Sequence, residues 1–161
     1  MKKHTISALV ENHFGVLASV AGLFSSRGFN IDSLSVGETE DPSISRMTIV
    51  VNGDDRILEQ VMKQLNRLVD VIKVIDLTIQ DYVDRELLLI KVSTSKAARS
   101  EIMEIVHVFR GRIIDISPST MTVEATGTEA KINAIIGMLR PFGIKEIART
   151  GKVALLREVK G

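Results

Sequence analysis

The chain of 161 residues carries 21 Lys and Arg against 20 Asp and Glu, giving a formal charge of +1 at neutral pH. This balance excludes a global field that would attract nucleic acid or an acidic membrane surface. Because the chain has no cysteine, disulfides, thiolate metal sites and a cysteine nucleophile are excluded, and we expect a protein of the reducing cytoplasm.

Two further features narrow the class of protein. Aromatic residues make up only 4% of the chain and tryptophan is absent, so the stacking surfaces of single-strand nucleic-acid binders are missing. Every apolar run is far shorter than the ~20 residues that span a bilayer, so we expect neither export nor membrane insertion. The 45% apolar fraction is enough to build packed cores.

Hydrophobic periodicity in the first half predicts the element order βαββαβ. Apolar residues alternate with a period of two in the strands and follow one helical face in the helices. The first helix ends at the glycine stop Arg27-Gly28, and Asp54 is a plausible N-cap of the second. The pattern predicts strands at 5–11, 29–37, 46–52 and 71–79 and helices over 16–24 and 57–68.

The second half repeats this order. It also repeats a short sequence motif, since Arg27-Gly28 and Ile31-Asp32 recur as Arg110-Gly111 and Ile114-Asp115. We expect strands at 86–94, 112–117, 121–126 and from 144, with helices over 96–109 and 132–139, whereas the tail after Arg149 carries weak signals.

These patterns predict an α+β protein made of two consecutive ferredoxin-like βαββαβ domains, in which two helices cover one face of an antiparallel sheet. We expect the first domain at 1–79, a polar linker at 80–85 and the second domain at 86–161. Apolar residues on the other face of the first sheet, namely Leu9, Val50 and Ile72, lead us to expect that this face packs on a partner.

The segment from Asn12 to Leu17 is the most informative of the chain, because a strand ends there and a helix begins after a glycine. Free backbone N–H groups and the positive end of a helix dipole favour a small carboxylate at such a place. Asn12 offers both a donor and an acceptor for an amino-acid ligand. The alternative is an ordinary N-cap and turn without a ligand.

Longer motifs then resemble one family. The runs ENHFGVL from Glu11 to Leu17 and GLFSSRGFNIDSL from Gly22 to Leu34 are similar to the N-terminal ACT domain of acetolactate synthase small subunits. The resemblance continues through SRMTI at 45–49 and LVDV at 68–71, and into the second half through FRG at 109–111, IID at 113–115 and Pro118.

This resemblance implies a regulatory subunit without catalytic activity of its own. Such a subunit activates the large catalytic subunit of acetolactate synthase and confers feedback inhibition by valine or a related branched-chain amino acid. It also implies a homodimer through ACT domains, and no cofactor on this chain, because thiamine diphosphate, Mg and FAD would belong to the catalytic subunit. The implied effector-binding residues are Asn12, Gly15, Val16 and Leu17 of one protomer with Asn30 and Ile31 of the other.

The residues themselves give little support for catalysis or a metal. No thiamine-diphosphate motif, GxGxxG, P-loop or nucleophile elbow occurs. The histidines His4, His13 and His107 lack the spacing of metal ligands. The acidic loop around Glu38 and Asp41 is typical of charged residues that are exposed to water. We therefore expect no metal site. Two alternatives remain open: a free-standing ACT-domain sensor of amino acids that regulates another enzyme, and a small enzyme on a ferredoxin-like fold.

Overall fold

The computed structural model describes residues 2–158 and divides them into two compact units. The first unit gathers the chain up to Val83 together with the segment from Lys152 onward, and the second runs from Asp84 to Gly151. Each unit has an antiparallel sheet built in the order βαββαβ. The predicted α+β class with two ferredoxin-like halves is therefore confirmed.

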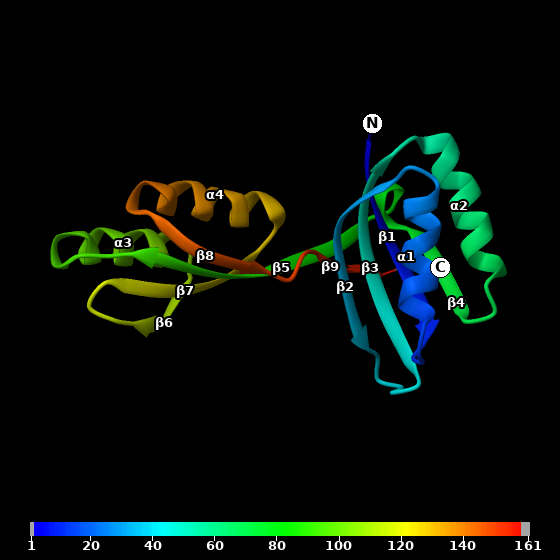
Figure 1. Ribbon diagram of the computed structural model, residues 1–161, viewed down its shortest axis with the longest axis horizontal. Coiled ribbons are helices and arrows are strands. Elements are labelled where there is room, and N and C mark those ends of the chain that lie inside the picture. The colour runs from blue at the N-terminus through cyan, green and yellow to red at the C-terminus, as the bar shows by residue number, and fades with distance from the viewer. Residues whose placement is uncertain (1, 159–161) are drawn as a thin grey trace. The chain divides into compact units, whose positions relative to one another are not determined.

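The first unit begins with a four-stranded sheet in the order β2-β3-β1-β4, so β2 and β4 are its edge strands (Figure 1). Two helices, α1 and α2, alternate with the strands along the chain, and a short 3-10 helix, η1, follows the last strand. The elements are β1 (Lys2–Glu11), α1 (Val16–Ser26), β2 (Asn30–Glu38), β3 (Ile44–Gly53), α2 (Asp55–Arg67), β4 (Val71–Asp76) and η1 (Leu77–Ile79).

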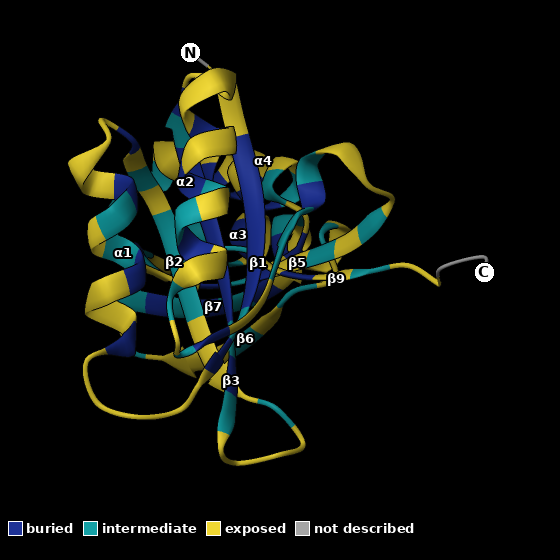
Figure 2. Ribbon diagram, turned by 90° about the vertical axis from the view of Figure 1, so that its right-hand side faces the viewer, coloured by how far each residue is buried: buried dark blue, intermediate teal, exposed yellow. Residues whose placement is uncertain are grey.

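Alternation along the strands fixes which sheet face meets the helices. In β1 the side chains of Ile6, Ala8 and Val10 join one buried cluster, to which α1 adds Val16, Val20 and Phe24. Because successive side chains of a strand point to opposite faces, the odd-numbered residues of β1 lie on the other face. Figure 1 shows α1 and α2 together on one side of β1 and β3, and Figure 2 shows β1 buried along most of its length.

The sheet face away from the helices is partly covered by the chain itself, whereas we expected a partner there. Val50 is buried and Leu9 half-buried within the chain itself, and only Ile72 of the three predicted residues is exposed. The strand β9 (Val153–Leu156) contributes Leu155 and Leu156 to a groove on this face. The C-terminal segment thus covers part of the surface that the sequence pattern assigned to a partner.

The second unit repeats the same layering. Its strands follow the order β6-β7-β5-β8, β9 pairs with β5 beyond this path, and its own core contains Leu88, Ile90 and Val92 of β5. The elements are β5 (Tyr82–Ser93), α3 (Lys96–Val108), β6 (Arg112–Ile116), β7 (Thr120–Gly127), α4 (Glu129–Leu139), a 3-10 helix η2 (Arg140–Phe142) and β8 (Ile144–Arg149).

The unit boundaries differ from the predicted domain ranges. The expected linker at 80–85 includes the beginning of β5 at Tyr82, and the segment from Lys152 onward belongs to the first unit instead of the second. The physical reason is that β9 places its apolar residues against the first sheet, a contact that local sequence pattern does not reveal. No helix in residues 2–158 is long and apolar enough to cross a membrane.

Candidate functional site

The loop between β1 and α1 leaves the start of a helix without a side-chain cap. Gly15 is the N-cap of α1, with φ 87° and ψ −13°, and no side chain accepts a hydrogen bond from the first turn. The other three α-helices of the described chain are capped by Asp54, Ser95 and Thr128. No side chain competes for the N–H groups at this helix start, and the N–H of Val16 makes only a long contact of 3.5 Å with the carbonyl of His13, so the start of α1 can bind a carboxylate.

Asn12 is not the cap of this helix. Its Nδ2 donates to the carbonyl of Pro42 at 3.0 Å and lies 3.4 Å from Oε1 of Glu38, while its backbone N–H donates to the carbonyl of Ser43 at 2.7 Å. These contacts tie the loop to the end of β2 and to the turn before β3. The side-chain oxygen of Asn12 makes none of these bonds, because all of them involve its nitrogens.

The apolar side chains of this loop are divided between core and solvent. Val16 is buried in the first core, whereas 47% of Leu17 is exposed. Phe14, next to Gly15, is fully exposed at 103%. Aromatic residues are enriched at protein interfaces, so Phe14 is a candidate for contact with a partner.

The two remaining predicted residues lie at the beginning of β2. Nδ2 of Asn30 donates to Oδ1 of Asp32 at 2.6 Å, and Asp32 also accepts from Asn52 at 3.2 Å. Ile31 is half-buried against the first core. Asn30 is exposed at an edge of the sheet, where it can meet a ligand or a second chain.

One chain does not bring the six predicted residues together. In the sheet register Asn30 pairs with Asn52, which in turn pairs with Lys3, whereas Asn12 follows Glu11 at the other end of β1. Lys3 and Glu11 are eight residues apart, which is about 25 Å along a strand. Asn12, Gly15, Val16 and Leu17 therefore form one group and Asn30 and Ile31 another, at opposite ends of the sheet.

The structure adds a polar cluster beside the loop that sequence analysis missed. Nε2 of His13 lies 2.7 Å from Oδ1 of Asp70 and 3.3 Å from Oε2 of Glu11. One ligand atom from each residue lies within 4.8 Å of the others, a grouping that can hold a divalent cation. Asp70 precedes β4, 57 residues from His13, so spacing along the chain gives no signal of this contact.

This cluster changes the titration of His13. The hydrogen bond to the Asp70 carboxylate, followed by the one to the carbonyl of Phe14, raises the pKa of His13 above its usual 6.5. The protonated imidazole therefore persists to higher pH and holds the loop to the turn before β4. The histidine acts here as a partner of carboxylates next to Gly15.

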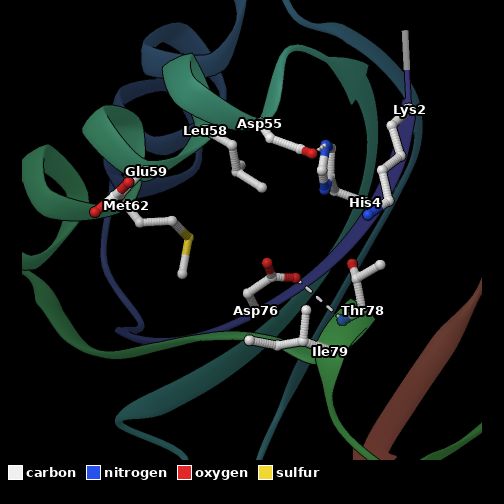
Figure 3. Close-up of a pocket in the computed structure, with 9 residues that line it drawn as sticks. All are labelled: Lys2, His4, Asp55, Leu58, Glu59, Met62, Asp76, Thr78 and Ile79. Carbon is white, nitrogen blue, oxygen red and sulfur yellow. Dashed lines mark hydrogen bonds and ion pairs between the residues drawn. The ribbon is translucent and has the colours of Figure 1, made fainter.

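A second polar place in the first unit is a cavity of about 340 Å³ between α2 and the β4–η1 segment (Figure 3). Several of its polar groups are engaged within the chain: Nε2 of His4 is 3.3 Å from the carbonyl of Gly53 and 3.1 Å from Oδ1 of Asp55. Asp76 accepts from the backbone N–H of Thr78, whose hydroxyl accepts from Thr5. These bonds hold η1 and the start of α2 against β1.

Both halves of the chain match known protein families. Residues 6–73 match the family described as an AHAS small subunit-like ACT domain, and residues 85–158 match the small subunit of acetolactate synthase. An acetolactate synthase small subunit of Aquifex aeolicus is 57% identical over 160 residues, which are 99% of this chain and 83% of that protein. This chain belongs to the acetolactate synthase small-subunit family.

Further relatives of the small-subunit family agree over nearly the whole chain. A probable acetolactate synthase small subunit of Methanothermobacter thermautotrophicus is 57% identical over 155 residues, covering 96% of this chain and 92% of that one. The crystal structure of the small subunit from Thermotoga maritima aligns with a TM-score of 0.89 at 45% identity and covers 99% of both chains. The first unit thus contains the ACT domain of a small subunit.

Proposed function

We propose that this small subunit is a non-catalytic regulator that activates the large, thiamine-diphosphate-dependent subunit of acetolactate synthase and transmits feedback inhibition by valine. The effector binds where the ACT domains of two copies meet. One observation carries this proposal: the two groups of candidate residues lie at opposite ends of one sheet, so only a second copy can unite them.

The edge strand β2 supplies a way to unite them. An exposed edge has unpaired backbone groups that can accept another strand. If two copies pair their β2 strands antiparallel around Leu34, the middle residue, then Asn30 of one copy lies opposite Glu38 of the other. Because Asn12 contacts Glu38 within each chain, this pairing places Asn12 of the partner copy beside Asn30.

The resulting site has the chemistry that an apolar amino acid requires. The uncapped N–H groups at Gly15, Val16 and Leu17 bind the carboxylate, the two asparagines orient the ligand, and Ile31 receives the branched side chain. One methylene changes such a fit by about 1–3 kcal/mol, so leucine and isoleucine bind the same site with graded affinity.

The second half supports assignment to an enzyme complex over a free-standing sensor, because residues 85–158 match the small-subunit family over a region that an ACT domain alone would lack. Thiamine diphosphate, Mg and FAD then belong to the catalytic partner. We place the complex in the cytoplasm, in keeping with a chain that has no cysteine.

Mixing two inactive variants tests whether the site is shared between copies. Gly15→Asp destroys the carboxylate side and Asn30→Ala the opposite side, so each variant alone binds no valine in calorimetry. A dimer with one copy of each has one intact site and one site with both changes. Refolding the two variants together therefore restores about a quarter of the wild-type sites.

Restoration of binding in the mixture supports the shared site. If the mixture binds no more valine than either variant alone while the wild-type protein binds, the effector site lies within one chain and the proposed geometry is wrong. A valine site that persists in full in Asn30→Ala contradicts the assignment of β2 to the site.

A further inference from the structure

A row of side chains crosses three strands on the sheet face away from α1 and α2. Leu9 of β1 pairs with Arg46 of β3 on one side and with Lys73 of β4 on the other. Neighbouring strands are about 4.8 Å apart, so two cationic residues flank one leucine at a Cα separation of about 10 Å. In the next row Ser7 pairs with Ile75, and Nη1 of Arg46 donates to the hydroxyl of Ser7 at 2.9 Å.

The C-terminal segment lies beside this row of side chains and forms one wall of a groove over it. Leu155 and Leu156 of β9 and Leu77 of η1 complete the lining around Arg46 and Lys73, and the open groove between them has a volume of about 270 Å³. This volume lies just below the usual range for ligand pockets, about 300–1,000 Å³, so the groove fits a small molecule and is too small for a helix of a protein partner.

The charges of the lining have one sign. Arg46 and Lys73 line the groove, and no carboxylate does. Within residues 2–158 neither cation forms an ion pair, although Arg46 is half-buried. A half-buried guanidinium that lacks an anionic partner is poorly compensated for lost hydration, which favours binding of an anion.

In the second unit, the charged residue at the equivalent position has a counter-ion within the sheet. Lys91 of β5 occupies the position that Leu9 has in β1. Glu146 of β8 is its partner in the sheet register, as Lys73 of β4 is the partner of Leu9. Nζ of Lys91 and Oε2 of Glu146 form an ion pair at 2.9 Å. The second sheet thus contains its own counter-ion in this row. The first sheet has two cations around an apolar residue instead.

We propose that this groove is a second ligand site, for a small molecule with one carboxylate and a short branched apolar tail. The Arg46 guanidinium and the Lys73 ammonium bind the carboxylate, and the tail packs on Leu9, Ile75 and Leu155. The site lacks a carboxylate to bind an amino group, which separates its ligand class from free amino acids. It is independent of the valine site proposed at the β1–α1 loop.

Methyl-detected NMR of the full chain, titrated with 4-methylpentanoate, tests this proposal. We expect saturable shifts of the methyl groups of Leu9, Ile75 and Leu155. Acetate, which lacks the tail, and 4-methylpentanamide, which lacks the charge, bind at least about tenfold more weakly.

Two charge variants and a matched control complete the test. Arg46→Gln and Lys73→Gln each weaken binding of 4-methylpentanoate by about tenfold, whereas Lys63→Gln, at an exposed position of α2, leaves it unchanged. Lys73→Gln keeps the test decisive if loss of the Arg46–Ser7 bond disturbs the fold. The proposal is overturned if no saturable shift occurs, if the amide binds as tightly as the acid, or if all three variants bind alike.

Discussion

Gly15 combines a left-handed backbone, with φ 87°, and open space where a Cβ would lie. A side chain at this position therefore enters the space in front of the uncapped start of α1. We predict that Gly15→Asp abolishes inhibition by valine, because its carboxylate occupies the place of the effector's carboxylate. The strained φ costs about 1–3 kcal/mol, so the fold and the activation of the enzyme are largely kept.

Acetolactate formation at increasing valine concentration measures this effect, and thermal unfolding measures the fold. The matched control is Gly22→Asp, which adds the same charge to the same helix at an exposed glycine with open space around it. Valine should inhibit the complex of the control normally. Undiminished inhibition in Gly15→Asp would remove this loop from the effector site.

His13 provides a second test at the residue scale. Its pKa is raised above 6.5, chiefly by the Asp70 carboxylate, so the ion pair stabilises the folded loop fully below pH 6.5. That contribution is lost as the pH rises through the folded-state pKa. In an NMR titration of the imidazole we expect a midpoint above 6.5, and Asp70→Asn should move it back toward 6.5. A midpoint that is the same in both proteins would contradict the contact.

At the scale of elements, β2 decides whether two copies can share a site. Val36 lies on this edge strand with 47% of its surface exposed. In antiparallel pairing around Leu34 it lies opposite Asp32 of the partner copy. We predict that Val36→Asp weakens the dimer by at least tenfold in dissociation constant, because it adds two like-charge contacts across the two-fold axis.

Analytical ultracentrifugation over a concentration series measures this dissociation. Val69→Asp is the control, since Val69 is 93% exposed in the turn before β4 and lies at the opposite edge of the sheet. The control should dimerise like the wild-type protein. If Val36→Asp does the same, the copies associate through another surface.

The sequence was sufficient for the elements and insufficient for their long-range contacts. Strong apolar periodicity predicted the four α-helices found in residues 2–158, and Asp54 caps α2 as expected. The four residues of β9 are too short for a periodic signal, and their partners lie in the first sheet, so the covering of that face was not predictable. The contact of His13 with Asp70 was missed because the two residues are far apart in the sequence.

The predicted site residues illustrate the same division. Asn12 and Gly15 were found because a strand end, a glycine and a helix start adjoin in sequence. Their separation from Asn30 depends on strand register, which local pattern does not fix. The hydrogen bonds of Asn12 to Pro42 and toward Glu38 likewise join segments that are distant in the chain.

At the scale of the whole molecule, an interfacial effector links sensing to assembly. A ligand that binds only the dimer stabilises it by RT ln(1 + [L]/Kd), which is about 2.7 kcal/mol at a hundredfold excess over Kd. With the proposed interfacial site, we expect valine to favour the paired ACT domains over separate ones. A catalytic subunit that senses this difference in the small subunit responds to valine without binding it.

In the proposed role, this chain makes acetolactate synthase responsive to valine. The most direct measurement is the rate of acetolactate formation by a cognate catalytic subunit, with and without this chain, across a titration of valine. We predict that the chain raises the rate and that valine reverses the increase, while the catalytic subunit alone does not respond to valine. An unchanged rate on addition of the chain, together with direct valine binding to it, would contradict this role and identify a free-standing sensor.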